Sequence, residues 1–231
     1  MKTDGITTYV SDYKSINENV LKQIFHCRKS VFIDRRKWDI GSYDDGELEV
    51  DDYDDVHSYY LYTWHEGVTG CVRLRPSHKP TLLSGPLQWI RSPIETKETQ
   101  GAVTWEASRF FITPRRSFAY GFSNNRIDAR TLALFDGMIN FAIASGIDSY
   151  EVVVDSLMER VLRRSGWKLN ILNSGVGTQQ ENVYYGLLDC SIESYQSLKR
   201  ISDILSNSKH GKGDSDIAIS SSISQLSSAP A

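Results

Sequence analysis

The sequence predicts an α/β protein of the mixed α+β type, in which helices pack on one mixed sheet. Extended segments dominate the first half of the chain, whereas helices and strands alternate in the second half. The chain has 231 residues, enough for one large domain or two small ones, and its 40% hydrophobic content can form a substantial core. We therefore expect a globular protein with layers of helix and sheet.

The first expected elements are a strand and a helix. Residues near 6–10 are rich in β-branched and aromatic side chains, which favours a short extended segment. Apolar residues then recur every three or four positions from Val20 to Val31, which is the spacing of a helix. Asn17 or Ser15 is suited to cap the start of that helix.

An acidic segment and a hairpin come next. Residues 39–55 are rich in aspartate and interrupted by glycine, so we expect a mobile loop there. Two extended runs at 58–64 and 68–75, joined by a turn ending in Gly67, predict an antiparallel hairpin. Residues 76–101 are rich in proline, serine and threonine and predict a long irregular connection.

The second half is expected to alternate between helices and strands. Helical spacing over residues 129–145 ends at Gly146, and a shorter helix over 156–165 ends at Gly166. Short apolar strands are expected at 150–154, 167–172 and 182–189. These elements complete one domain over residues 1–205, whereas the serine-rich residues 206–231 are expected to form a disordered or loosely attached tail.

Composition excludes several classes of function. The formal net charge of −3, from 26 basic and 29 acidic residues, gives no global basic field for nucleic-acid binding. No stretch has the length of a signal peptide's apolar core or of a membrane span, so we expect a cytoplasmic protein. Cys27, Cys71 and Cys190 are scattered singly, which indicates reduced thiols rather than disulfides or zinc. The acidic segment lacks EF-hand spacing, so no metal is expected.

A strand at 103–113 carries two charges that require a physical reason. Simple alternation places Glu106, Ser108 and Phe110 on one face and Trp105, Arg109 and Phe111 on the other, unless a bulge intervenes. A buried charge without a partner costs several kcal/mol, so Arg109 should meet acids and Glu106 should meet a donor, a ligand or water. An ordinary structural ion pair is the alternative.

Other charges in the chain are natural partners for that strand. The acidic segment supplies Glu49, Asp51 and Asp54 at close spacing, and Arg73 lies in the apolar hairpin. Arg73 and Arg109 are therefore expected to be counter-charges for these acids, whereas the alternative is a solvated acidic loop.

These residues together resemble the acyl-homoserine-lactone synthase family, the autoinducer synthases of bacterial quorum sensing. The family pattern is R-x-x-x-F with a tryptophan six residues later, then E-x-D-x-[YF]-D, R-[LF] and E-x-S-R-F. This sequence carries it in order as Arg28, Phe32, Trp38, Glu49, Asp51, Asp54, Arg73, Leu74, Glu106, Ser108, Arg109 and Phe110. The match spans about residues 20–190 and is specific as a constellation, although Lys37 and Arg75 depart from common usage.

The resemblance implies a fold and an activity. The family fold is like that of the GCN5-related N-acetyltransferases, a three-layer sandwich with a twisted mixed sheet flanked by helices. Its enzymes take an acyl chain from acyl carrier protein and the homoserine moiety from S-adenosylmethionine, which is a substrate, so no cofactor is expected. The amine is acylated, and the carboxylate then closes onto the γ-carbon and expels methylthioadenosine.

The resemblance also implies roles for individual residues. Arg28, Phe32 and Trp38 would surround S-adenosylmethionine, and Trp38 and Phe32 offer a π face for its sulfonium or adenine. An electrostatic cluster that orders the acidic segment would consist of Asp51, Asp54, Arg73 and Arg109. Glu106 is the candidate base that takes the amine proton, directly or through water.

The acyl side is expected to involve Ser108, Phe110 and Val152, with backbone N–H groups near Phe110 binding the oxyanion. Val152 cannot hydrogen-bond a 3-oxo group, which favours an unsubstituted acyl chain. Carrier-protein docking is assigned to the basic residues Arg160, Arg163, Arg164 and Lys168, with Arg115 and Arg116 as another candidate. The alternative for this group is a favourable cationic helix end.

Two other functions stay open at this point. An acyl-CoA-dependent N-acyltransferase of the same fold would normally carry R/Q-x-x-G-x-G/A before a helix, to bind pyrophosphate on backbone N–H groups, and residues 112–125 do not fit that motif. A non-catalytic signal-binding or protein-interaction module would leave Glu106, Arg109, Asp51 and Asp54 without a catalytic reason.

Overall fold

The computed structural model describes residues 6–38, 46–91, 101–114 and 127–207. Its centre is a seven-stranded sheet in the order β1-β2-β3-β4-β5-β7-β6, in which β4 and β5 are parallel and the other neighbours antiparallel. The strands are β1 Thr7–Asp12, β2 Tyr59–Trp64, β3 Val68–Pro76, β4 Thr104–Ile112, β5 Ser149–Asp155, β6 Leu169–Val176 and β7 Asn182–Asp189. The expected mixed sheet is confirmed.

The helices follow the expected order with one addition. They are α1 Glu18–Arg28, the π-helical segment η1 Lys29–Arg35, α2 Ala129–Ser145, α3 Ser156–Ser165 and α4 Ile192–Asn207. Asn17 caps α1 by accepting the N–H groups of Asn19 and Val20, and Gly146 and Gly166 end α2 and α3 in the left-handed conformation, as predicted. Helix α4 is the addition, because no helix was expected after the strand at 182–189.

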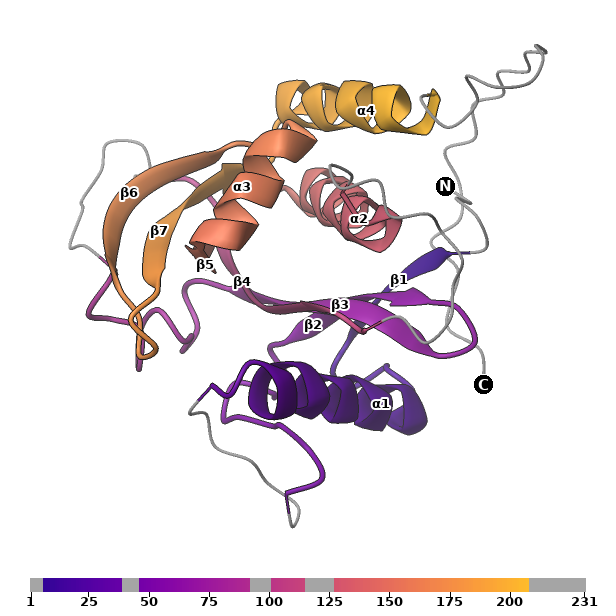
Figure 1. Cartoon of the computed structure of the whole chain (residues 1–231), viewed down its shortest axis with the longest axis vertical. Coiled ribbons are helices and arrows are strands. Elements are labelled where there is room, and N and C mark those ends of the chain that lie inside the picture. Colours follow the sequence, from indigo (N-terminus) through magenta and orange to yellow (C-terminus); the bar gives the residue numbers. More distant parts are fainter. Residues whose placement is uncertain (1–5, 39–45, 92–100, 115–126, 208–231) are drawn as a thin grey trace.

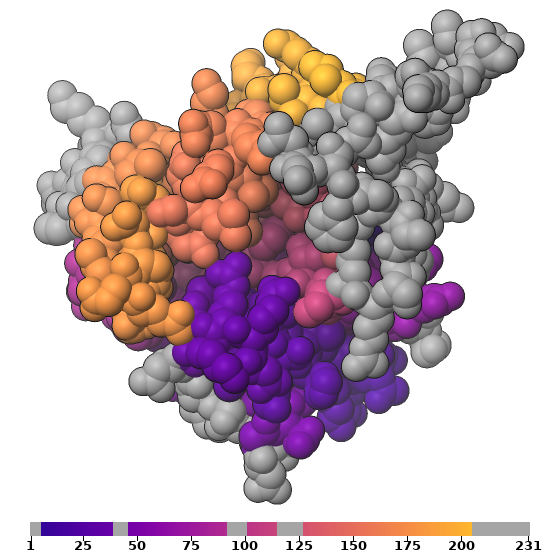
Figure 2. All heavy atoms as spheres, viewed as in Figure 1, coloured from indigo at the N-terminus to yellow at the C-terminus, as the bar shows by residue number. Residues whose placement is uncertain are grey.

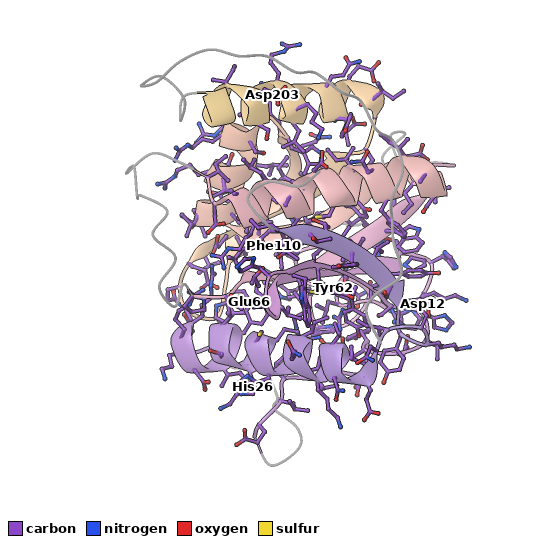
Figure 3. All side chains as sticks on the ribbon, turned by 90° about the vertical axis from the view of Figure 1, so that its right-hand side faces the viewer. Asp12, His26, Tyr62, Glu66, Phe110 and Asp203 are labelled. Carbon is purple, nitrogen blue, oxygen red and sulfur yellow. The ribbon has the colours of Figure 1, made fainter. Side chains whose placement is uncertain are left out.

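The helices lie on both faces of the sheet (Figure 1). Helix α1 packs on the strands of the N-terminal half through a core that includes Ile24, Phe32 and Tyr60. Helices α2, α3 and α4 cover the opposite face, where Phe135, Leu162 and Leu198 belong to the main core. We call these the α1 face and the α2 face, and Figure 3 labels Tyr62 on the former and Phe110 on the latter.

A bulge in β4 decides which charges share a face. Arg73 pairs with Ser108 and Cys71 pairs with Phe111, so two residues of β4 stand opposite one residue of β3. Arg109 occupies the left-handed region with φ 55°. The simple alternation expected for this strand is therefore wrong beyond Ser108.

The bulge brings both charges of β4 to the α1 face. Arg109 contacts Glu49 and Asp51 there, and Phe111 packs edge-on against Phe32. The core of the α2 face includes Trp105, Ala107 and Phe110. The prediction that Phe110 shares a face with Glu106 and Ser108 is therefore wrong.

The two halves of the chain also meet directly. In Figure 2 the indigo atoms of the N-terminal helical region lie against the orange atoms of the second half. Arg36 donates to Asp155 at 2.8 Å, and the side chain of Gln179 donates to the carbonyls of Arg36 and Lys37. Within the described ranges, no helix combines the length and apolar character required to cross a membrane.

Candidate active site

The α1 face carries a buried network of three arginines and three acids, which we call the ionic network. Its members are Arg28, Glu49, Asp51, Asp54, Arg73 and Arg109. It joins α1 and strands β3 and β4 to the acidic segment, and its formal charges cancel. The expected pairing of Arg73 and Arg109 with these acids is thus present in the structure.

Asp54 is at the centre of the ionic network. Its Oδ1 accepts from Arg28 Nη1 at 2.8 Å and from the Tyr60 hydroxyl at 2.8 Å, and it lies 3.0 Å from Arg73 Nη1. Burial by itself would raise the pKa of Asp54, but the charges of Arg28 and Arg73, with hydrogen bonds from Arg28 and the Asp51 N–H, hold that pKa well below its usual range. Asp54 therefore stays ionised.

The remaining contacts fasten the acidic segment to the sheet. Glu49 binds Arg28 Nε and accepts from Arg109 Nε at 3.1 Å, and Asp51 Oδ2 lies 2.7 Å from Arg109 Nη2. Glu49 and Asp54 are buried, although composition favoured a mobile, solvated loop. Residues 46–55 are therefore anchored, and residues 39–45 of that expected loop lie outside the described residues.

An aromatic pair lies beside the network. The rings of Phe32 and Trp38 stack with their centroids 5.1 Å apart and their planes 7° apart. Phe32 is fully buried, whereas Trp38 is partly exposed and has the guanidinium of Arg36 over its ring at 5.4 Å. Arg28 and Phe32 lie on neighbouring turns of α1 and η1, so the three residues expected around S-adenosylmethionine are close in the fold.

Glu106 is buried with an incomplete set of partners. It is 2% exposed, and its Oε2 accepts the Leu83 N–H at 2.8 Å. Its Oε1 is buried and has no hydrogen-bond partner within the described residues. A buried carboxylate oxygen without a donor is costly, so its persistence indicates a ligand or a reacting group.

The pairing of the central parallel strands ends at Glu106. β4 and β5 pair only over Thr104–Ser149, Trp105–Tyr150 and Glu106–Glu151, after which β5 pairs with β7 alone. Separation of two neighbouring strands leaves backbone groups of both outside the ladder. Glu106 thus lies at the last paired position of the two central parallel strands.

The three residues assigned to the acyl side do not lie together. Ser108 is on the α1 face, where its hydroxyl accepts from Arg73 Nε at 3.3 Å. Phe110 and Val152 are on the α2 face, Phe110 with its ring 5.5 Å from that of Phe135 and Val152 in the main core at 5% exposure. The bulge in β4 is the reason, because it reverses the alternation after Ser108.

The basic residues assigned to docking form an exposed group around the end of α3. Arg160, Arg163, Arg164 and Lys168 are all exposed, and Arg163 pairs with Glu159 at 3.3 Å. The alternative docking residues Arg115 and Arg116 lie outside the described residues.

Sequence reasoning missed two further ion pairs on the α1 face, each with one buried and one partly exposed partner. Arg75 binds Asp55, and Arg91 binds Glu151, which also accepts from the Tyr185 hydroxyl at 2.8 Å. Their signal was present, because Arg75 and Glu151 are charges within apolar strands, as Glu106 and Arg109 are.

The fold first defines the class of the protein. A mixed sheet whose central parallel strands separate, with helices on both faces, is the fold of the GCN5-related acyltransferases, as predicted. An acyl-CoA N-acyltransferase from Pseudomonas aeruginosa shares it with a TM-score of 0.52 at 14% identity, over 79% of this chain and 99% of that chain.

The family follows from the sequence comparisons. A family model described as autoinducer synthase matches residues 12–198. An acyl-homoserine-lactone synthase of Dickeya dadantii (strain 3937) is 30% identical over 197 residues, which cover 83% of this chain and 88% of that relative. The chain therefore belongs to the autoinducer synthase family of acyl-homoserine-lactone synthases, as the signature residues predicted.

Solved structures of such synthases have the same fold. The acyl-homoserine-lactone synthase LasI superposes with a TM-score of 0.70 at 20% identity, over 84% of this chain and 94% of that chain. The CoA-dependent synthase BjaI was solved with S-adenosylmethionine and isopentyl-CoA. It superposes with a TM-score of 0.68 at 23% identity, over 86% of this chain and 90% of that chain.

Proposed function

We propose that this enzyme makes an N-acyl-homoserine lactone from acyl-[acyl carrier protein] and S-adenosylmethionine. The amine of S-adenosylmethionine attacks the thioester and releases the carrier thiol. The carboxylate then attacks the γ-carbon and expels methylthioadenosine, which closes the lactone. The observation that carries the proposal is Glu106, a buried carboxylate at the point where β4 and β5 separate, one oxygen of which has no donor in the part of the chain that the structure describes.

Glu106 is the proposed catalytic base. A free α-amino group has a pKa of about 8, so most of the substrate amine is protonated near neutral pH and must lose that proton before it attacks. Glu106 Oε1 takes the proton, directly or through one water, while the Leu83 N–H holds Oε2. Ring closure needs mainly positioning, because the sulfonium is an excellent leaving group and the attack is intramolecular.

The ionic network and the aromatic pair are proposed to form the S-adenosylmethionine side. The network fixes the acidic segment against the sheet, and Phe32 and Trp38 offer aromatic faces to the sulfonium or adenine. The BjaI structure contains S-adenosylmethionine on the same fold, which supports this assignment.

The α2 face is proposed to hold the acyl chain. Phe110 and Val152 lie there in the main core, and the bulge in β4 frees backbone N–H groups near Phe110 to bind the oxyanion. Val152 has no hydrogen-bonding group, which supports an unsubstituted acyl chain.

Acyl carrier protein is our proposed donor, and an acyl-CoA is the alternative. Carrier proteins of this kind are acidic, and the exposed basic group around the end of α3 gives a complementary surface. The sequence also lacks the R/Q-x-x-G-x-G/A motif that binds pyrophosphate. The CoA-dependent synthase BjaI has the same fold, so the donor must be measured.

The proposed function is tested with purified enzyme, S-adenosylmethionine and one acyl chain supplied on either carrier. Lactone is identified by mass spectrometry, which also reports the preferred chain in a panel of lengths. We expect kcat/KM to be at least about tenfold higher with acyl carrier protein than with CoA. A higher value with CoA would reassign the donor, and no lactone with either would refute the proposed function.

We also propose that residues 1–205 act as one catalytic domain. Leu198 of α4 belongs to the main core, so α4 is part of that domain, and its last residue Asn207 lies beyond the expected boundary. An enzyme ending at Asn207 should keep full activity, whereas one ending before α4 should lose its fold.

A further inference from the structure

Glu106 has two arginines near its strand neighbours, the buried Arg75 and the partly exposed Arg91, and neither binds it. In β3, Arg75 is its direct register partner, and in β5 the partner is Glu151, which holds Arg91. Residues in register on neighbouring strands present their side chains to the same face. A buried carboxylate next to arginines would normally pair with one of them, because an isolated buried charge is costly. Each of these arginines is instead bound to another acid.

The Arg91 side is held by Glu151 and Tyr185. Arg91 Nη2 donates to both carboxylate oxygens of Glu151, at 3.0 and 3.1 Å, and the Tyr185 hydroxyl donates to Oε1 at 2.8 Å. Burial and the Glu151 charge raise the pKa of Tyr185 to about 12, so its hydroxyl stays protonated and donates. Arg91 is one-third exposed, and Glu151 is the acid that binds it among the described residues.

The Arg75 side is held by more partners. Arg75 is 1% exposed, and its guanidinium donates to both oxygens of Asp55 and to the carbonyls of Tyr53 and Pro80. The backbone carbonyls would keep Arg75 near its position even without Asp55. Within the described ranges, Arg91 has fewer partners than Arg75, so we expect Arg91 to move more readily when its acid is removed.

One segment connects both sides of Glu106. Leu83 donates its N–H to Glu106 and packs with Ile90 against Tyr185, and the side chain of Asn173 donates to the Ile90 carbonyl at 2.9 Å. Arg91 follows directly in the chain. The segment therefore carries the donor for Glu106 and the guanidinium of Arg91, which is bound to Glu151, the strand neighbour of Glu106.

We propose that Glu151 and Asp55 are positioning residues that hold Arg91 and Arg75 away from Glu106 and so keep its carboxylate free of a counter-charge. The proposal rests on the proposed role of Glu106 as base. A carboxylate paired with an arginine is stabilised in its charged form and accepts a proton less readily. The two acids thus preserve the basicity of Glu106 without touching substrate.

The test is a charge-matched rescue. Glu151→Gln leaves Arg91 without its acid, so Arg91 pairs with Glu106 and kcat falls about 100-fold, the scale of one lost base, with KM for S-adenosylmethionine within about threefold. Adding Arg91→Gln removes the freed charge, and kcat should return to within about tenfold of wild type. Asp55→Asn and its double variant with Arg75→Gln should repeat the pattern with a smaller first loss.

A purely structural role gives the opposite result, because removing two anchors harms the enzyme at least as much as removing one. A folded Arg91→Gln/Glu151→Gln variant that is as slow as Glu106→Gln overturns the proposal, even if Glu151→Gln does not fold. So does a Glu151→Gln variant with wild-type kcat. Circular dichroism and thermal unfolding establish that each variant is folded.

Two controls separate this proposal from the proposed function. Asp136→Asn breaks the partly buried pair with Lys199 between α2 and α4, where Lys199 Nζ lies 2.7 Å from Asp136 Oδ1, and should leave kcat unchanged. If wild type makes no lactone, or Glu106→Gln is fully active, the role assigned to Glu106 fails. If Glu106→Gln is inactive and the rescue is absent, only the positioning role fails.

Discussion

The ionic network and the surroundings of Glu106 lie on the same face of the sheet but differ in how their buried charges are paired. In the network, three arginines meet three acids. The Asp54 carboxylate accepts hydrogen bonds from Arg28, from the Tyr60 hydroxyl and from the Asp51 N–H. Around Glu106, two arginines are bound to other acids, and among the described residues Oε1 has no donor. Ion pairing in the network anchors the acidic segment, although Arg28 Nη2 has no hydrogen-bond partner within the described ranges, whereas the unpaired Glu106 oxygen is the group that we propose to accept a proton.

Breaking the network should produce the largest effect on stability. Asp54→Asn removes the charge shared by Arg28 and Arg73 and leaves both buried without full compensation. We expect a loss of about 3–5 kcal/mol in the free energy of unfolding, measured by urea denaturation. Glu18→Gln, which removes an exposed pair with Lys22, is the control and should leave the unfolding midpoint unchanged. Equal midpoints for the two variants would contradict the assignment.

The same contrast predicts a loss of stability in acid. The pKa of Asp54 is depressed in the folded state, because the arginines outweigh the opposing effect of burial. Such a group stabilises the fold above its unfolded pKa, near 3.8, and the contribution is lost as the pH falls from that value toward the folded pKa. The free energy of unfolding of wild type should therefore drop below about pH 4. In Asp54→Asn the drop should be shallower, and an identical slope would show that another group is responsible.

The aromatic pair should affect substrate binding more than stability. Trp38→Ala removes the exposed partner of the stack on Phe32, so KM for S-adenosylmethionine should rise about tenfold at nearly constant kcat. Trp89 is 56% exposed and packs near Gly175, so Trp89→Ala serves as the matched control with KM unchanged. A similar KM for both variants would remove Trp38 from the binding site.

Changes to the exposed basic residues around the end of α3 should have the smallest effect on catalysis. Arg163→Glu/Arg164→Glu reverses two exposed charges and should raise KM for the acyl carrier protein substrate several-fold, with the difference fading at high salt. KM for S-adenosylmethionine should stay constant. An unchanged KM for the carrier substrate at low salt would exclude this surface.

Sequence predicted those features that depend on local pattern. The hairpin, the Asn17 cap and the glycine ends of α2 and α3 follow from composition and spacing, and all are confirmed. Helix α4 had a usable signal that was missed, because the Ser191 hydroxyl accepts the Ser194 N–H and Leu198 is buried about two helical turns after Ser191. Signals of this kind involve residues that are close in the sequence, so they can be recognised without the structure.

The remaining features depend on contacts between distant segments. The face of Arg109 is set by a bulge at which this arginine adopts φ 55°, and arginine has no particular preference for that conformation. The pairs Arg75–Asp55 and Arg91–Glu151 join residues 20 and 60 positions apart. A charge within an apolar strand predicts that a partner of opposite charge exists. Which acid binds which arginine depends on the order of the strands in the sheet, which the local sequence does not show.

The central claim is that Glu106 is left unpaired in order to accept the amine proton, and Glu106→Gln tests it most directly. The amide can keep the hydrogen bond from Leu83 but cannot act as a base, so kcat for lactone formation should fall about 10²- to 10⁴-fold with no loss of thermal stability. Glu47→Gln, on the exposed part of the acidic segment, should leave kcat unchanged. Near-normal lactone formation by a folded Glu106→Gln enzyme would contradict the account.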